Sequence, residues 1–139
     1  MEWTFENQME DMSDEDLKAR IEAAQAYEVP AKIKPIPYVG DKTAIVTYES
    51  AELIARCPVT GYPDLYTITF ELVPDASIPE LKTLKFYLMA YVDLPIAHEH
   101  LASKIYHDFK SAVAPTRLRV TLDVAVRGGI RTSVVLGEL

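Results

Sequence analysis

The chain has 139 residues, of which 49% are hydrophobic and 25% charged, and its formal net charge is −7. This length predicts one domain with a buried core, and the acidic balance argues against a large nucleic-acid surface. A single cysteine excludes an internal disulfide. No apolar run could span a bilayer and no signal-peptide pattern opens the chain, so we expect a cytoplasmic protein without a membrane partner.

The sequence predicts an N-terminal extension with one helix over residues 1–40 and the main domain over residues 41–139. Residues 1–12 show no hydrophobic period and are predicted to form an arm. Ser13, followed by three acidic residues, is typical of a helix start, because serine caps and first-turn acids suit a helix N-terminus. We expect a surface helix from there to about Tyr27. The proline-rich stretch 32–38 predicts an extended connector.

The first half of the main domain alternates between strand and helix patterns. Residues 43–48 are rich in β-branched side chains and predict a strand. The alternation of Tyr66, Ile68, Phe70 and Leu72 with polar residues predicts a second, half-buried strand. Residues 79–93 have helical spacing, with Pro79 in the first turn. The inward stripe predicted for this helix is Leu81, Leu84, Leu88 and Val92.

The second half of the main domain shows one helix pattern followed by two strand patterns. A second helix is predicted from near His98 to just before Pro115. Alternating apolar residues over 118–126 predict a strand, Gly128-Gly129 a tight turn, and residues 130–136 the returning strand.

The predicted order is therefore strand, strand, helix, helix, strand, strand. It predicts an α+β domain with an antiparallel sheet and helices on one face. Four strands cannot close a barrel and leave two free edges. Edge pairing between subunits would satisfy them, so we expect a homo-oligomer.

Cys57 and Asp64 bracket a loop that contains two prolines and a glycine. A rigid, folded-back loop of this kind can hold a sulfur and a carboxyl group close together, as a nucleophile and its acid–base partner require. The alternative is a small buried hydrophobe, the more common role of a lone cysteine. The neighbouring Arg56 and the loop favour an accessible thiol beside a cation.

Other polar residues allow two interpretations. Lys82 and Lys85 share one helix face, which is commonly just a solvated surface. His98-Glu99-His100 has no further His or Cys cluster, and residues two apart diverge on a helix, so we predict no metal site. A recessed Glu99 suits a planar ligand with adjacent N–H donors, such as a guanine-like edge.

Taken together, four motifs resemble the nitrile reductases of queuosine biosynthesis, the QueF family, in their single-module form. The motifs are Cys57-Pro58 with Asp64, Glu80-Leu81-Lys82-Thr83-Leu84-Lys85-Phe86-Tyr87, His98-Glu99 and Arg127-Gly128-Gly129. The resemblance covers about residues 45–136. It implies a tunnelling fold, in which β-β-α-α-β-β subunits assemble into pentameric barrels, commonly stacked in pairs, with active sites between subunits.

The resemblance also implies an activity in this tRNA-modification pathway. NADPH would reduce 7-cyano-7-deazaguanine to 7-aminomethyl-7-deazaguanine through a Cys57 thioimide, with Asp64 as the proton donor. By the same resemblance, Pro79, Glu80, Leu81, His98 and Glu99 would bind substrate, and Lys82, Lys85 and Arg127 would bind NADPH. No stable nucleic-acid partner is expected.

One departure keeps other functions open. Tyr91-Val92-Asp93 stands where the reductases usually carry Phe-Arg-Asn, so an arginine is missing. A related amidinotransferase would pass ammonia instead of hydride to the same thioimide. A non-catalytic purine- or pterin-binding module would bind the nitrile without forming a thioimide, and an acidic scaffold would bury Cys57.

Overall fold

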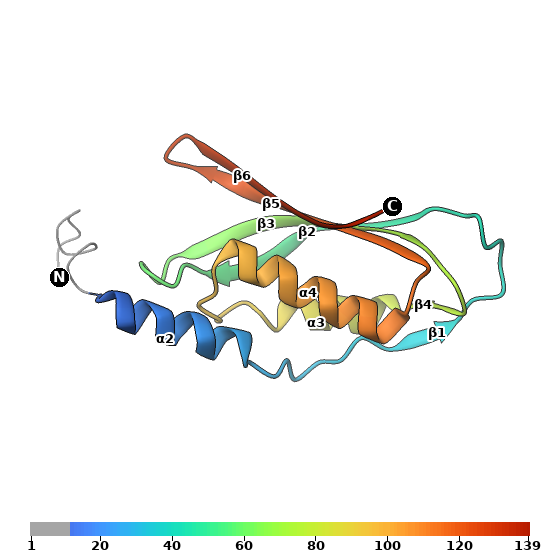
Figure 1. Cartoon of the computed structure of the whole chain (residues 1–139), viewed down its shortest axis with the longest axis horizontal. Helices are drawn as coiled ribbons and strands as arrows, with labels where there is room; N and C mark the ends of the chain where they lie inside the picture. The colour runs from blue at the N-terminus through green and yellow to red at the C-terminus, as the bar shows by residue number, and fades with distance from the viewer. Residues whose placement is uncertain (1–11) are drawn as a thin grey trace.

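The computed structural model describes residues 12–139. The strands of its main sheet and the two helices that follow the second of them have the predicted strand, strand, helix, helix, strand, strand order. Four antiparallel strands form the main sheet in the order β2-β3-β5-β6. Their bounds are Val46–Arg56, Pro63–Val73, Arg117–Arg127 and Ile130–Glu138. The sheet is open, with β2 and β6 at its two edges, and helices lie on one of its faces (Figure 1). The predicted α+β class is confirmed.

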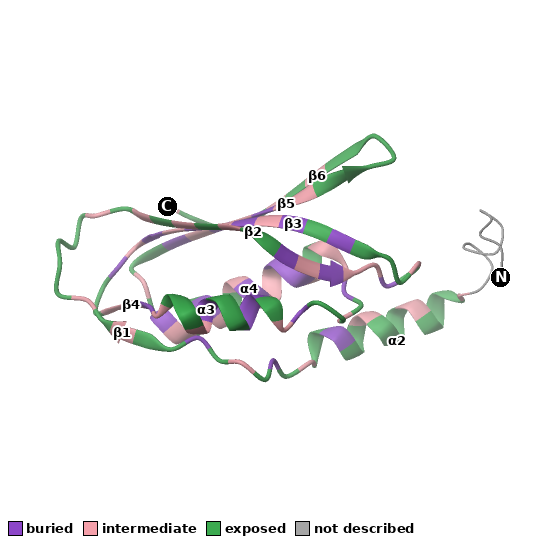
Figure 2. Ribbon diagram, turned by 180° about the vertical axis from the view of Figure 1, so that it is seen from behind, coloured by how far each residue is buried: buried purple, intermediate pink, exposed green. Residues whose placement is uncertain are grey.

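Alternating side chains build the core between this sheet and its helices. On β3 every second residue from Asp64 to Leu72 is buried, as the alternation predicted. Helices α3 (Leu81–Met89) and α4 (His98–Val113) cover that face. Phe70 of the sheet stacks on Phe109 of α4, with ring centroids 4.5 Å apart. Figure 2 shows the buried positions concentrated between the two layers.

Elements of the N-terminal part pack onto the same core. Helix α2 (Asp14–Gln25) begins after Ser13, whose hydroxyl accepts the N–H of Asp16, as expected of a capping serine. It is largely exposed, but its Ala24 is buried in the core. The short strand β1 (Pro35–Pro37) pairs with β4 (Ser77–Pro79) in a separate two-stranded sheet. The arm predicted over residues 1–12 lies outside the described residues except for Met12.

The strand and helix bounds correct several details of the sequence interpretation. The strand predicted over 43–48 begins at Val46 and continues to Arg56. The helix predicted over 79–93 is confined to Leu81–Met89, because Pro79 belongs to β4 and Glu80 caps the helix.

The inward stripe predicted for this helix was also partly wrong. Leu81 and Val92 are 56% and 43% exposed, since Leu81 is the first residue of the helix and Val92 lies beyond its last residue, Met89. Leu84 and Leu88 are buried as predicted, and Tyr87 of the helix and Tyr91 just after it complete the buried face. Within the described residues no helix is long and apolar enough to cross a membrane.

Candidate functional site

The loop between β2 and β3 holds Cys57 in a defined position. The Cys57 N–H donates to the Tyr62 carbonyl at 2.9 Å, and the Gly61 N–H donates to the Cys57 carbonyl at 2.9 Å. Gly61 has a φ of 75°, a left-handed conformation that favours glycine. The Thr60 N–H points at the Cys57 sulfur, 3.4 Å away. The thiol is partly exposed, so the loop presents a fixed sulfur that a ligand can reach.

A β-bulge in β2 decides which way Cys57 faces. Up to Ser50 the even-numbered residues of the strand lie on the covered face, and from Leu53 onward the odd-numbered residues do. The change occurs where the pairing register shifts, between Ser50 and Leu53. A bulge inserts one extra residue and so reverses the alternation. Cys57 therefore continues the inward series of Leu53 and Ala55 toward the face of β3 that carries Asp64.

Asp64 is the buried charged side chain of this face, with 6% of its surface exposed. Its partner is Arg127, at the tip of the β5–β6 hairpin, with Nη1 3.5 Å from Oδ1. The Arg127 guanidinium also donates to the Pro63 carbonyl. A buried carboxylate needs such a partner, because removing its water is costly. The structure thus joins two predicted site residues, Asp64 and Arg127, in one ion pair.

The segment after α3 brings the start of α4 to the Cys57 loop. The Arg56 N–H donates to the Leu94 carbonyl at 2.9 Å, and the Ile96 N–H donates to the Arg56 carbonyl at 3.0 Å. This short parallel bridge fixes the chain just before His98, the first residue of α4. The Arg56 side chain does not turn to the sulfur but braces the loop, bonding the Gly61 carbonyl at 3.0 Å and Asp93 at 3.3 Å.

Tyr66 is a site residue that the sequence interpretation missed. Its hydroxyl lies 2.7 Å from His98 Nδ1, and its side chain is almost fully buried. Burial raises the pKa of Tyr66 far above its usual value, and the nearby negative charges of Asp64, Cys57 and Glu99 raise it further. These influences show that the four groups share one neighbourhood. Tyr66 lies two residues after Asp64, on the same face of β3, which was the available signal.

The predicted substrate segment lies at the other end of α3. The Glu80 carboxylate caps this helix, accepting the N–H groups of Lys82 at 3.0 Å and Thr83 at 2.7 Å. Pro79 is buried in β4, which pairs with β1. The C-terminal end of α3 leads into the bridge beside Cys57, so a nine-residue helix, about 13 Å long, separates the two groups. One chain therefore does not bring residues 79–81 to the thiol.

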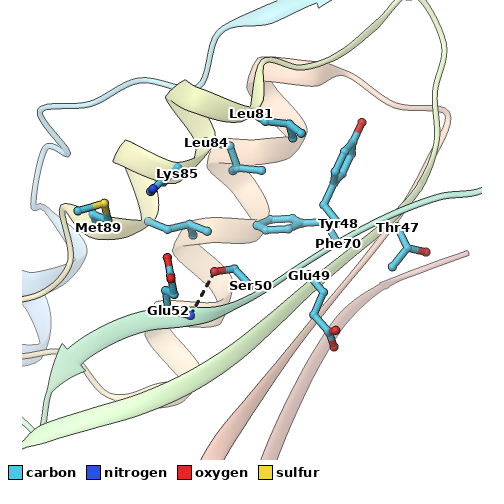
Figure 3. Close-up of a pocket in the computed structure, with 11 residues that line it drawn as sticks. Thr47, Tyr48, Glu49, Ser50, Glu52, Phe70, Leu81, Leu84, Lys85 and Met89 are labelled. Carbon is cyan, nitrogen blue, oxygen red and sulfur yellow. Dashed lines mark hydrogen bonds between the residues drawn. The ribbon is translucent and has the colours of Figure 1, made fainter.

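A cavity of about 390 Å³ lies between α3 and the edge strand β2. Figure 3 shows Leu81 and Leu84 of α3 above Tyr48 and Phe70 of the sheet, with Lys85 on the side of Met89. Its lining combines apolar side chains of α3 and the sheet with polar ones, among them Ser50, Glu52 and Lys85. Lys82 is exposed on the same helix. The cavity is thus associated with predicted residues of α3 and not with Cys57.

Among residues 12–139 no group of three or more His, Cys, Asp or Glu side chains could hold a metal ion.

The predicted site residues form two groups in the chain. One contains Cys57, Asp64, His98, Glu99 and Arg127 around Tyr66, and the other contains residues 79–82 and Lys85.

Comparisons with known proteins associate this chain with one family. Residues 63–138 match the family described as QueF, "QueF-like protein". A protein of Syntrophus aciditrophicus named NADPH-dependent 7-cyano-7-deazaguanine reductase is 44% identical over 94 residues, which are 68% of this chain and 67% of that protein. A Nostoc protein of the same name is 40% identical over 100 residues, covering 72% of this chain and 73% of its own length.

A solved structure supports the fold. The apo crystal structure of an archaeosine synthase, QueF-Like, aligns with a TM-score of 0.64 and 23% identity, covering 70% of this chain and 95% of that one. The tunnelling fold predicted from the sequence is thereby confirmed for the single chain. The family match begins at Pro63, so it includes Asp64, His98 and Arg127 but not Cys57.

Proposed function

This chain belongs to the QueF family, and from that premise we propose that it reduces the nitrile of 7-cyano-7-deazaguanine to the aminomethyl group with NADPH. The observation that carries the proposal is the agreement among curated relatives. Proteins at 36–44% identity from several bacteria have the same name, NADPH-dependent 7-cyano-7-deazaguanine reductase. The grouping of Cys57, Asp64 and the start of α4 supports the same chemistry.

In this proposal Cys57 is the nucleophile. Its thiolate forms a bond to the nitrile carbon while one π bond of the C≡N group breaks, which places the electron pair on nitrogen. Asp64 takes up the proton that the Cys57 thiol gives up and delivers it to that nitrogen, giving a neutral thioimide. The fixed loop and the inward direction of Cys57 support this assignment, because both reacting groups then lie on the covered face of the sheet.

Binding of the base is assigned to the start of α4 and to the β4–α3 junction. Glu99 would accept hydrogen bonds from adjacent N–H groups of the base, with His98 beside it. Pro79, Glu80 and Leu81 would contact the substrate mainly through main-chain groups. The capping role of the Glu80 side chain is compatible with this, since it leaves the main chain of residues 79–81 to make the contact.

The exposed cations of α3 fit the phosphates of NADPH, which supplies the hydride for both reductions when bound. Lys82 and Lys85 are both exposed and lie three residues apart on one helix face. Arg127 is assigned to the same cofactor, although its guanidinium pairs with Asp64 in the single chain. Lys82→Ala should raise the NADPH concentration needed for half-maximal rate, whereas Lys18→Ala, on the exposed helix α2, should not.

We further propose that residues 41–139 form the reductase domain, that residues 1–40 are an extension, and that the chain assembles as a barrel-forming homo-oligomer. The open sheet with edges at β2 and β6 supports assembly. Two separate groups of predicted site residues in one chain support active sites between subunits.

The decisive experiment follows the reduced-nicotinamide absorbance after 7-cyano-7-deazaguanine is added to the purified protein and NADPH. We expect two NADPH oxidised per nitrile consumed, and Cys57→Ala should abolish both this oxidation and the mass increase of the protein by one substrate. Substrate turnover that survives in Cys57→Ala would remove the covalent mechanism. Absence of NADPH oxidation in the parent protein would refute the reductase.

The same experiment tests an amidinotransferase. The observation that favours it is Val92, 43% exposed, at the position where the resembling reductases carry arginine. An amidinotransferase would form the Cys57 adduct, and added ammonia would displace the thiolate to release an amidine. NADPH would not be oxidised.

A further inference from the structure

Tyr66 occupies the centre of the group that contains the proposed nucleophile and base-binding residues. It lies on β3, with 2% of its surface exposed. Its hydroxyl is 2.7 Å from His98 Nδ1. The two rings meet edge to face, with centroids 5.5 Å apart and an interplanar angle of 75°. Both the distance and the packing therefore fix the His98 ring relative to the sheet.

The direction of this hydrogen bond follows from its surroundings. Burial raises the pKa of Tyr66, and the negative charges of Asp64, Cys57 and Glu99 raise it further, so the phenol keeps its proton. In a neutral imidazole one nitrogen donates and the other accepts. If His98 Nδ1 donated to the phenol oxygen, the phenol hydrogen would need another acceptor, and His98 is the one hydrogen-bond partner that the described residues give this hydroxyl.

We propose that Tyr66 is a positioning residue that donates its hydroxyl hydrogen to His98 Nδ1 and thereby holds His98 as the Nε2-protonated tautomer. His98 then offers an N–H donor next to the Glu99 carboxylate, which is an acceptor. A donor beside an acceptor complements a planar base edge that has a carbonyl oxygen next to N–H groups. This inference rests on the proposed function, because it assigns that ligand edge to the start of α4.

The test compares Tyr66→Phe with Tyr27→Phe. Both lose a partly buried phenol hydrogen bond, since the Tyr27 hydroxyl donates to the Ala90 carbonyl at 3.2 Å, outside the proposed site. Nitrogen-15 NMR of histidine-labelled protein at pH 8 reports which ring nitrogen carries hydrogen, and His98→Gln assigns the His98 signals. The parent and Tyr27→Phe should show a protonated Nε2 and an unprotonated Nδ1, and Tyr66→Phe should show averaged tautomers.

Kinetics give the second result. Tyr66→Phe should raise the KM for 7-cyano-7-deazaguanine about tenfold, the effect of one lost directed hydrogen bond, with much less change in kcat. Tyr27→Phe should match the parent. A protonated Nδ1 in the parent protein would overturn the proposal without any variant, and so would equal tautomer populations and KM values in the two phenylalanine variants. If the parent oxidises no NADPH, the proposed function has failed and the nitrogen shifts alone decide on Tyr66.

Discussion

At the scale of single residues, the site depends on which side chains share the covered face of the sheet. Asp64 is buried beside a single cation, Arg127. In that position it is shielded from water and directed to the face that Cys57 approaches. A carboxyl group held this way can deliver a proton to a defined atom rather than exchange it with solvent.

Replacing Asp64 with asparagine keeps the shape of the side chain and removes its acidity. We expect Asp64→Asn to slow thioimide formation by about 100-fold or more, the usual contribution of a positioned acid, with a much smaller change in substrate affinity. Stopped-flow absorbance of the adduct gives the rate of thioimide formation. Equilibrium binding of substrate to Cys57→Ala and to the Cys57→Ala, Asp64→Asn double variant gives the change in affinity. Asp123→Asn, on the uncovered face of β5, is the control. Thioimide formation at the parent rate in Asp64→Asn would remove this residue from the mechanism.

Sequence reasoning selected Cys57 and Asp64 as candidate site residues but not Tyr66. The proline and glycine positions of the loop are local signals, and they placed the thiol and the carboxylate at the two ends of one hairpin turn. Tyr66 belongs to an alternating strand, in which a core tyrosine and a site tyrosine have the same pattern. Its role depends on His98, 32 residues away, and no local pattern indicates that contact.

At the scale of elements, the start of α3 shows why a predicted ligand residue also has a structural role. Glu80 precedes the helix in an extended conformation, and its carboxylate accepts two backbone N–H groups. These bonds, first the one from Thr83, lower the pKa of Glu80 below its ordinary value. The sequence interpretation began the helix at Pro79, two residues too early, because proline is common in the first turn of a helix. Glu80 was therefore not identified as the capping residue.

The cap makes a specific contribution to the pH dependence of stability. Because the folded-state pKa of Glu80 is lowered, its stabilisation is present above the ordinary glutamate pKa and is lost as the pH falls through the folded value. Glu80→Gln should therefore lower the melting temperature at pH 7, and the difference from the parent should shrink toward pH 3. Circular dichroism melts give both values. Glu28→Gln, an exposed control, should follow the parent curve, and a constant difference across this range would contradict the role of the charge.

Strand β6 contains a glycine whose replacement should be costly. Gly137 has a φ of 84°, and a Cβ there would lie 2.1 Å from the Leu118 carbonyl oxygen. Gly129, in the hairpin turn, has a φ of 76° but no atom within 4 Å of that position. We expect Gly129→Ala to lower the free energy of unfolding by about 1 kcal/mol, and Gly137→Ala by about 3 kcal/mol. Urea unfolding measures both, and equal losses would show that β6 shifts to accept the methyl group.

At the scale of the whole molecule, the two groups of site residues are separated within one chain. The Cys57 group lies where α3 ends and α4 begins, and residues 79–82 lie where α3 starts. The β-β-α-α-β-β order could be predicted from periodicity because each element has its own pattern. The separation could not, since it follows from the direction in which α3 runs across the sheet.

Subunit mixing tests whether neighbouring copies supply the two groups. We expect Cys57→Ala protein to be inactive and Lys82→Ala protein to be slow at limiting NADPH. After joint denaturation and refolding the mixture should regain activity, because about one quarter of randomly formed interfaces would have both native residues. Light scattering should show a mass that is a multiple of the 15.6 kDa chain. Activity no greater than the mean of the separate proteins would place both groups in one subunit.

The bulge of β2 also limits how this chain can change through evolution. Side chains along the strand can be exchanged one by one, because each exchange leaves the alternation intact. Deleting a single residue at Ala51 or Glu52 would remove the reversal of alternation that begins at Leu53. Cys57 would then point away from Asp64 while every other site residue kept its place. Lineages with this fold should therefore tolerate substitutions in β2 but lose the chemistry through a one-codon deletion, even where the protein still folds.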